Sequence, residues 1–256
     1  MLAWLESFGR FADYAAKVCW AIPGALVRRP GEVARQLERV ALGGLGVVVA
    51  AGGCVGLVTW LQTRRLLVAY GVESTLPSVL AAAVLVETGP ILASLLIAGR
   101  MGAGLAAELG SMRLTEEDDA RDILGAPILP SLVAPRAIAC ALAAPLLTIW
   151  IDAAALLGGL AAELRGGSLT AEAFGLRCLD YLRLVDVVPS TLKTAGFGLL
   201  VGLVGCHAGL TAERSAEAVG RAATRGVVRS MLAVFAANVA AVAAIQAALA
   251  ASGASY

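Results

Sequence analysis

The sequence has few charged residues and few aromatic ones. Charged residues make up 15% of the 256 positions and aromatic residues 5%, whereas hydrophobic residues make up 59% and the mean hydropathy is +0.82. Soluble domains usually carry about 25% charged residues, so this chain has too few charges to cover the surface of an ordinary soluble protein. The same apolar content excludes an intrinsically disordered chain. The composition therefore predicts a membrane-embedded protein.

Histidine and lysine are also scarce, which excludes several kinds of active site. His207 is the only histidine, so neither a histidine-based triad nor a multi-histidine metal site is expected. Neither of the two lysines, Lys17 and Lys193, follows a glycine, so the chain has no Walker A motif with which to bind ATP itself. Residues 102–107 match the dinucleotide pattern G-x-G-x-x-A, but no strand–turn–helix unit surrounds them. The five cysteines are scattered singly, which disfavours disulfides and zinc. We therefore expect no cofactor and no metal.

The apolar residues that are present lie in five long segments. Each is long enough to cross a hydrocarbon layer of about 30 Å, and the segments are 40–62, 76–98, 137–162, 187–212 and 230–256. Before them, Trp4, Leu5, Phe8 and Phe11 recur at helical spacing, which predicts an amphipathic interfacial helix interrupted at Pro23-Gly24. The predicted fold is an all-α integral membrane protein with a single domain, 1–256. Residues 1–39 form its interfacial region and 40–256 a five-span transmembrane bundle.

The positively charged residues indicate the orientation of the spans. With the N-terminus inside, the inner segments carry 14 Lys and Arg residues and the outer segments carry 5. Because cytoplasmic loops are enriched in these residues, we expect a cytoplasmic N-terminus and a C-terminus on the far side. The net charge of +1 predicts no attraction to nucleic acid.

Glycines at G-x-x-x-G spacing predict close packing between helices. Such spacing lets two helix backbones approach each other, and three pairs have it: Gly52 and Gly56, Gly198 and Gly202, and Gly205 and Gly209. The alternative is that glycine is simply common in membrane helices.

Four charged residues lie within the apolar segments or at their ends: Glu87, Asp152, Asp186 and Lys193. A charge at the centre of a membrane helix costs about 2.5–3.5 kcal/mol on insertion scales, so these residues should face protein or a wet cavity. Glu87 and Lys193 are a candidate ion pair. They could belong to a substrate cavity, or they could only hold helices together. Gly89-Pro90 should let the helix bend or break beside Glu87.

A polar segment between the second and third spans carries signals for a short helix. Thr115 could cap a helix whose first turn holds Glu116, Glu117 and Asp118, and Gly125 is a stop signal. Three apolar residues before it share one helical face: Leu105, Leu109 and Met112. Because a connection between membrane helices needs no such element, we expect a docking surface for a partner. A solvated charged loop is the alternative.

These residues carry a resemblance to a known family. The stretch from Glu87 to Met112 reads ETGPILASLLIAGRMGAGLAAELGSM and resembles the signature region of the MlaE/YrbE permeases, the membrane subunits of ABC systems that work with MCE-domain proteins. Thr115-Glu116 and Pro135-Arg136 continue the match. Residues 220–228, GRAATRGVV, resemble the family's motif G-x-A-T-T-x-[AS]-V-V. The resemblance covers nearly the whole chain.

The resemblance implies a permease subunit that does no covalent chemistry. Such permeases form homodimers in the bacterial inner membrane and bind two cytoplasmic ATPase subunits, periplasmic MCE-domain subunits and, in some systems, a STAS-domain protein. They move phospholipids or related hydrophobic molecules between the inner membrane and the periplasmic path to the outer membrane. By motif position, the lipid cavity would include Leu66, Leu67, Tyr70, Glu87 and Thr88. The cytoplasmic coupling helix would span Gly102 to about Leu124 and include Gly102, Leu105, Glu108, Leu109, Met112, Thr115, Glu116, Glu117 and Asp118.

The sequence departs from the family pattern at three places. Val86 stands where many members have Arg, the Tyr that is common before the final motif is missing, and Asp152 has no counterpart. These differences leave open an uptake permease for sterol-like or aromatic compounds. Two further alternatives are a non-transporting scaffold subunit and an intramembrane enzyme that uses Glu87 and Asp152 as paired carboxylates. The enzyme is disfavoured because the two residues lie on different spans with no nucleophile placed between them.

Overall fold

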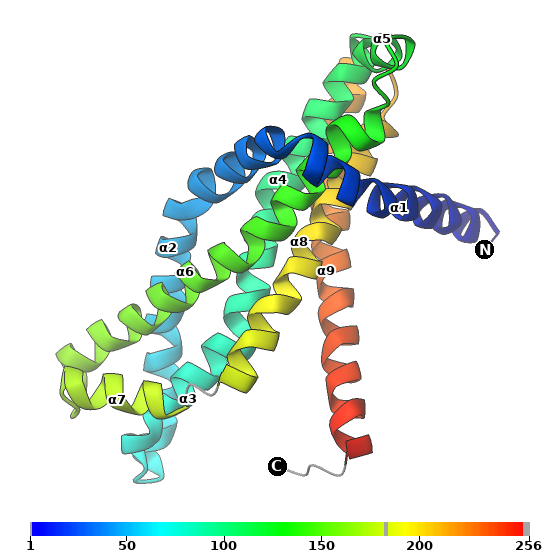
Figure 1. Ribbon diagram of the computed structural model, residues 1–256. Helices are drawn as coiled ribbons and strands as arrows, with labels where there is room; N and C mark the ends of the chain where they lie inside the picture. The colour runs from blue at the N-terminus through cyan, green and yellow to red at the C-terminus, as the bar shows by residue number, and fades with distance from the viewer. Residues whose placement is uncertain (1, 182–183, 253–256) are drawn as a thin grey trace. The chain divides into compact units, whose positions relative to one another are not determined.

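The computed structural model describes residues 2–181 and 184–252, which are almost entirely helical (Figure 1). The long helices are α1 (Leu2–Arg28), α2 (Pro30–Ala69), α4 (Gly89–Leu114), α6 (Ala134–Gly166), α8 (Leu184–Leu210) and α9 (Ala216–Ser252). The short ones are α3 (Leu76–Ala82), α5 (Glu117–Ile123) and α7 (Ala171–Tyr181). A 3-10 turn covers Glu73–Thr75, and π-helical turns cover Ala83–Thr88 and Leu129–Val133. The described residues contain no strand.

Five of the helical segments in the described residues are long and apolar enough to cross a membrane, which confirms the predicted number of spans. They are Pro30–Ala69, Glu73–Leu114, Leu129–Gly166, Val187–Leu210 and Ala216–Ala244. Most helices are longer than the apolar runs that predict them. The helix α2, for example, continues past Arg64-Arg65, because long basic side chains at a span end can reach the interface without ending the helix. The predicted fifth segment extends to Tyr256, and its residues 253–256 lie outside the described part.

The N-terminal segment forms the predicted helix, but the predicted interruption at Pro23-Gly24 is wrong. The helix α1 runs through Pro23 to Arg28, and Arg29 N still donates a hydrogen bond to Ala25 O at 2.9 Å. The break comes at Arg29 because a residue that precedes proline, here Pro30, is disfavoured in helical conformation. The side chains of Trp4, Leu5 and Phe8 lie outside the described part, and the interfacial position of α1 stays a prediction.

The chain divides into two compact units, and each is described by itself. Unit 1 comprises the described residues of 1–40, 97–143 and 196–256. Within it, α1 contacts the π-helical turn Leu129–Val133. The His207 ring of α8 packs against the rings of Phe11 and Tyr14, at centroid distances of 5.3 and 4.9 Å. These contacts fix α1 to the rest of unit 1.

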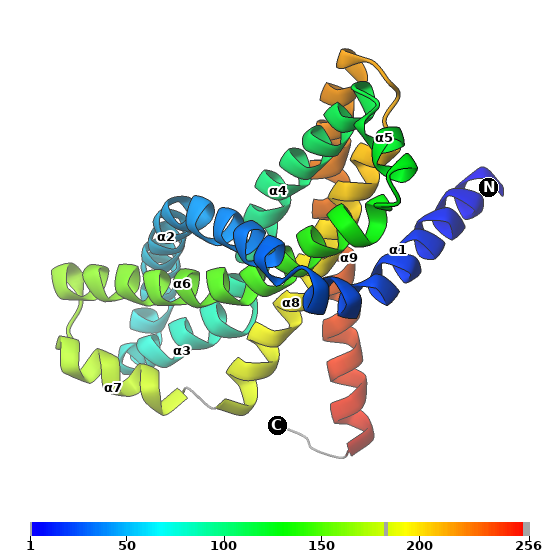
Figure 2. The same ribbon diagram turned by 45° about the horizontal axis from the view of Figure 1, so that its top comes forward.

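Unit 2 comprises residues 41–96 and the described residues of 144–195. Within it, α7 lies alongside α3 (Figure 2). Ser78 Oγ donates a hydrogen bond to Arg177 O at 3.2 Å, and Arg177 in turn donates to Ser74 O. A core of buried side chains holds this end of the unit together: Trp60, Leu76, Leu80, Ala81, Val84, Leu85, Ala155, Ala162, Phe174 and Cys178.

Helix pairs in both units approach each other at glycines. In unit 2, a Cβ at Gly56 would overlap Ala155 O, and a Cβ at Gly52 would lie 2.7 Å from Ile151 O. In unit 1, a Cβ at Gly209 would lie 2.7 Å from Ala106 O. The close packing predicted for Gly52 and Gly56 and for Gly209 is therefore present. At these contacts no other residue fits without moving a backbone.

We expect Gly56→Ala to lower the free energy of unfolding by about 1–3 kcal/mol, the usual effect of overpacking. Its new methyl group would displace the backbone of α6 at Ala155. The measurement is thermal unfolding of the purified protein in detergent. Gly46→Ala is the matched control, because Gly46 lies on the same helix with nothing within 4 Å of its Cβ position. Equal stability of the two variants would contradict the assigned α2–α6 contact.

Candidate functional site

The segment between α4 and α6 forms the predicted short helix, α5, but its predicted cap is wrong. Glu116 adopts a left-handed backbone with φ of 58°, and α5 begins only at Glu117. Thr115 Oγ1 donates at 3.2 Å to the carbonyl oxygens of Ser111 and Met112. Because the chain turns at Glu116, Thr115 belongs to the end of α4, where it satisfies carbonyls that the last helical turn leaves free.

The end of α5 is as predicted. Gly125 has φ of +69°, a conformation that glycine adopts without penalty, and Ala126 N donates to Arg121 O at 3.0 Å across the helix end. This hydrogen bond closes the helix and directs the chain back toward α6.

Two arginines fasten α5 to the rest of unit 1. Arg214, in the turn between α8 and α9, pairs with Asp119 and with Glu116, the latter at 3.4 Å. Arg113, on α4, pairs with Asp118 at 3.3 Å and donates to Leu210 O at the end of α8. The helix α5 therefore lies beside the α8–α9 turn at one end of unit 1 (Figure 1). Several of its acidic groups serve this attachment, and they do not form a free acidic surface.

Most of the α4 residues assigned to coupling lie inside unit 1. Gly102, Leu105 and Leu109 are buried, and Leu105 and Leu109 are each 1% exposed. Gly102 faces Gly226 of α9, and a Cβ there would lie 3.0 Å from Gly226 O. Glu108 binds Arg136 at 2.6 Å. Gly102, Leu105 and Leu109 expose almost no surface to a partner, and Glu108, 33% exposed, is held by Arg136. The part that these residues can play is therefore to position α4, which carries α5. Met112 is half-buried.

Two exposed apolar residues at the end of α5 are not among the individual residues predicted to contact a partner. Ile123 is 86% exposed and Leu124 is 81% exposed. The sequence feature that could have identified them is a pair of large apolar residues directly before Gly125, in a segment that is otherwise polar. Large exposed apolar side chains of this kind are typical of a protein contact. They make this end of α5 the candidate docking surface.

The charged residues of unit 2 form the predicted ion pair. Lys193 Nζ lies 3.1 Å from Glu87 Oε1 and donates a second hydrogen bond to Val86 O at 3.2 Å. That carbonyl lies in the π-helical turn Ala83–Thr88, where the wider turn alters the regular backbone hydrogen bonds. The Lys193 side chain is 11% exposed and that of Glu87 is 42% exposed. The expected bend or break at Gly89-Pro90 takes the form of this π-helical turn, and α4 continues directly from it.

Asp152 occupies the position that a side chain at Gly89 would need. A Cβ on Gly89 would overlap Asp152 Oδ1, so a larger residue there would require the Asp152 side chain to move. Asp152 is 5% exposed, and its Oδ1 makes no hydrogen bond to any described residue. Asp152 thus packs against the start of α4, whereas Glu87 binds Lys193. This arrangement gives no support to the enzyme alternative. The side chain of Asp186 lies outside the described part.

The residues assigned to a lipid cavity lie in two places in unit 2. Leu66, Leu67 and Tyr70 are near the end of α2, where Leu66 is 64% exposed and Tyr70 is 80% exposed. Leu67 packs partly against the buried core of this unit. Glu87 and Thr88 belong to the π-helical turn. No contact described within the unit joins the two groups, and the cavity stays a prediction.

Comparisons with known proteins agree over most of the chain. A family model described as "Permease MlaE" matches residues 33–244. A probable ABC transporter permease of Synechocystis is 34% identical over 78% of this chain and 76% of its own length. A probable ABC transporter permease of Rickettsia felis is 30% identical over 90% and 88%. The chloroplast protein TRIGALACTOSYLDIACYLGLYCEROL 1 of Arabidopsis thaliana is 33% identical over 78% and 57%.

We expect Glu87 and Lys193 to be energetically coupled by about 0.5–3 kcal/mol. Glu87→Gln should lower the unfolding temperature in detergent more than the double variant Glu87→Gln/Lys193→Met does. The reason is that the single change leaves a nearly buried ammonium without its carboxylate. The exposed pair Lys17–Asp13 is the control, and its coupling should stay below about 0.5 kcal/mol. Additive effects at Glu87 and Lys193 would contradict the pair.

Proposed function

The chain belongs to the MlaE permease family, and on this basis we propose that it is the membrane subunit of an ABC transporter that moves phospholipids or related hydrophobic molecules. The transport would run between the bacterial inner membrane and the periplasmic path to the outer membrane. ATP hydrolysis would take place in a separate cytoplasmic subunit. In this proposal the chain has a cytoplasmic N-terminus and forms a single permease domain, 1–256.

The exposed end of α5 is the observation that carries this proposal. An ATPase can drive a permease only if its movement reaches the membrane helices, so the contact must be attached firmly to them. Arg113 and Arg214 provide this attachment to α4 and to the α8–α9 turn. Ile123 and Leu124 provide the apolar surface on which a partner can dock. Closure of the ATPases would then pull on α4, α8 and α9 together.

Two observations support the proposed substrate, namely the exposed apolar side chains at the end of α2 and the name of one relative. The residues Leu66 and Tyr70 present large surfaces at the end of α2, beside the partly buried Leu67. The name of the Arabidopsis relative contains that of a glycolipid. We assign Leu66, Leu67, Tyr70, Glu87 and Thr88 to a lipid cavity that opens and closes during transport.

A second copy of the chain is the proposed partner of α9. A stripe of exposed apolar residues runs along this helix: Val228, Leu232, Phe235 and Val239. Only 11% of the most apolar stretch of this span is buried within the chain. A homodimer would cover part of this stripe and place two cavities about one axis. Periplasmic MCE-domain subunits and, as an optional component, a STAS-domain protein complete the proposed assembly.

One observation favours a second candidate, the uptake of sterol-like or aromatic compounds. Val86 supplies no positive charge to a head group, and Lys193 is already paired with Glu87. An uncharged apolar molecule would therefore fit beside Val86 and Lys193 as well as a phospholipid would. Competition between a phospholipid and a sterol for the same crosslinking position separates the two candidates.

We expect the double variant Ile123→Ser/Leu124→Ser to lose at least about tenfold in affinity for the ATPase, because central apolar residues of an interface carry most of its energy. The measurement is co-purification of the ATPase with the tagged permease from a membrane extract. Leu176→Ser/Leu179→Ser is the matched control, since it removes two exposed leucines from another short helix, α7. Equal ATPase recovery with both variants would disprove the docking site.

We expect a photo-crosslinker at Leu66 or Tyr70 to capture phospholipid and to capture less of it after the ATPase is trapped with vanadate. Closure of the cavity on ATP binding would expel the lipid. A crosslinker at Leu146, which is 46% exposed on α6, is the control for lipid of the surrounding membrane and should give a constant yield. A yield that is unchanged by trapping at all three positions contradicts the cavity assignment, and so does capture of protein alone at Leu66 and Tyr70.

A further inference from the structure

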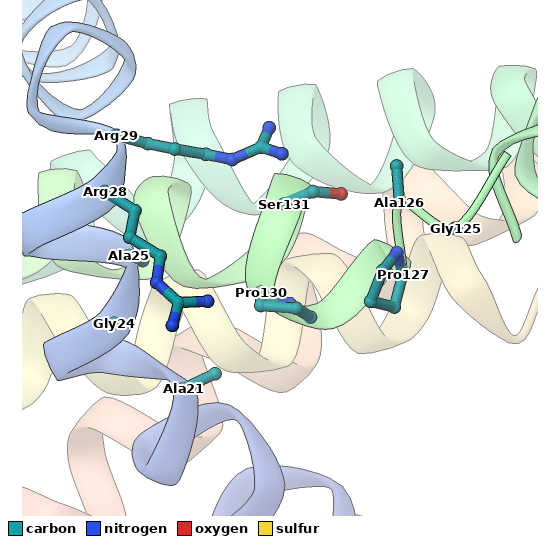
Figure 3. Close-up of a pocket in the computed structure, with 10 residues that line it drawn as sticks. All are labelled: Ala21, Gly24, Ala25, Arg28, Arg29, Gly125, Ala126, Pro127, Pro130 and Ser131. Carbon is teal, nitrogen blue, oxygen red and sulfur yellow. The ribbon is translucent and has the colours of Figure 1, made fainter.

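Unit 1 contains a cavity that none of the assigned functions uses. Its volume is about 410 Å³, which falls in the range of about 300–1,000 Å³ found for small-ligand sites. One wall is the end of α1 with Arg28 and Arg29, and the other is the segment from Gly125 to Ser131 that leads from α5 into α6 (Figure 3). Both guanidinium groups extend from the α1 side toward this segment (Figure 3).

The cavity is positively charged. Neither Arg28 nor Arg29 takes part in an ion pair with a described residue, whereas the neighbouring Arg35 is paired with Glu32. A second cavity of about 280 Å³ shares Arg29 and Ser131 with the first. Its other arginines, Arg35, Arg39, Arg121 and Arg136, are paired with glutamates, two of which, Glu32 and Glu108, also line it. Because Arg28 and Arg29 have no acidic partner among the described residues, an anion placed beside them would be stabilised.

Ser131 supplies an independent sign of a ligand. The residue is 3% exposed, lines both cavities, and its Oγ makes no hydrogen bond to any described residue. Arg136 is also 3% exposed and lines the second cavity, and its Nε makes no hydrogen bond to any described residue. Since nearly all buried polar groups have partners, those that lack one require an explanation. A bound anion that accepts hydrogen bonds from both groups is such an explanation.

We propose that the first cavity, at the Arg29 and Ser131 that it shares with the second, binds the phosphate group of an anionic phospholipid head group. Phosphate matches the donors, because guanidinium groups bind its oxygens in pairs and a serine hydroxyl can donate to a third. A lipid matches the surroundings. Trp20, one helical turn before Gly24 of the cavity wall, is 90% exposed, and Val27 beside Arg28 is 80% exposed. Apolar residues next to basic ones are typical of a membrane surface, where basic pockets bind lipid head groups.

The site is separate from the proposed lipid cavity, whose residues all belong to unit 2. A lipid held between the end of α1 and the segment after α5 would join the interfacial helix to the helix proposed to contact the ATPase. The proposal does not depend on transport, since it concerns only the binding of a head group to the resting protein.

The test is native mass spectrometry of the purified full-length protein in detergent, with added dioleoyl-phosphatidylglycerol, dioleoyl-phosphatidylcholine or inorganic phosphate. The wild-type protein should retain phosphatidylglycerol in preference to phosphatidylcholine. The variant Arg28→Gln/Arg29→Gln should bind phosphatidylglycerol about 25-fold more weakly, which is about fivefold for each arginine. The matched control Arg64→Gln/Arg65→Gln, which changes an arginine pair on α2, should stay within about twofold because it lies outside the cavity.

Ser131→Ala is the second variant, and it tests the site through a change that should leave the fold intact. It should weaken phosphatidylglycerol binding about tenfold, the effect of removing a hydrogen bond to a charged group. Its unfolding temperature without lipid should not fall, because Ser131 Oγ has no partner to lose among the described residues. Three results overturn the proposal: equal loss with both arginine-pair variants, equal retention of the two lipids, or displacement of phosphatidylglycerol by millimolar inorganic phosphate. The last would assign the site to a soluble phosphate.

Discussion

Charged side chains within the long helices of unit 2 are held by partners from distant parts of the chain, and these contacts organise that unit. Lys193 is held by Glu87 and by Val86 O in the π-helical turn. Glu163, 3% exposed, accepts hydrogen bonds from Trp60 Nε1 at 2.7 Å and from two backbone N–H groups after α6. Each partner comes from a different part of the chain. Because a charge without its partner is costly away from water, each of these contacts fixes the position of one helix against another.

The same requirement explains how a short helix can be both rigid and available to a partner. Arg113 and Arg214 use the acidic side chains of α5 to attach it to neighbouring helices of unit 1. Among the described side chains at the C-terminal end of α5, two large apolar ones, Ile123 and Leu124, are exposed. Attachment through charge and the proposed docking through apolar contact therefore involve different residues. This division suits a permease, because force from an ATPase must enter at one surface and pass to several helices.

The sequence predicts the features that a local pattern or a rare pair of opposite charges specifies, and it fails where the outcome depends on which surfaces or backbone turns come together. The five spans, the short helix α5, its stop at Gly125 and the Glu87–Lys193 pair follow from apolar length, glycine conformation and opposite charge. The buried position of Leu105 and Leu109 could not be predicted, because a helical face of leucines does not say whether it meets another helix or a partner. The fit of Asp152 against Gly89 and the role of Thr115 at the end of α4 depend on contacts and backbone turns that leave no periodic pattern.

We propose that this chain moves lipid at the expense of ATP hydrolysis by a partner. The most direct measurement places the permease and its ATPase in vesicles that contain a fluorescent phospholipid, and follows its transfer to acceptor vesicles. We expect transfer that requires ATP and stops with a non-hydrolysable analogue. Equal rates of transfer with ATP, with the analogue and without nucleotide would show that the chain does not use ATP hydrolysis to move lipid.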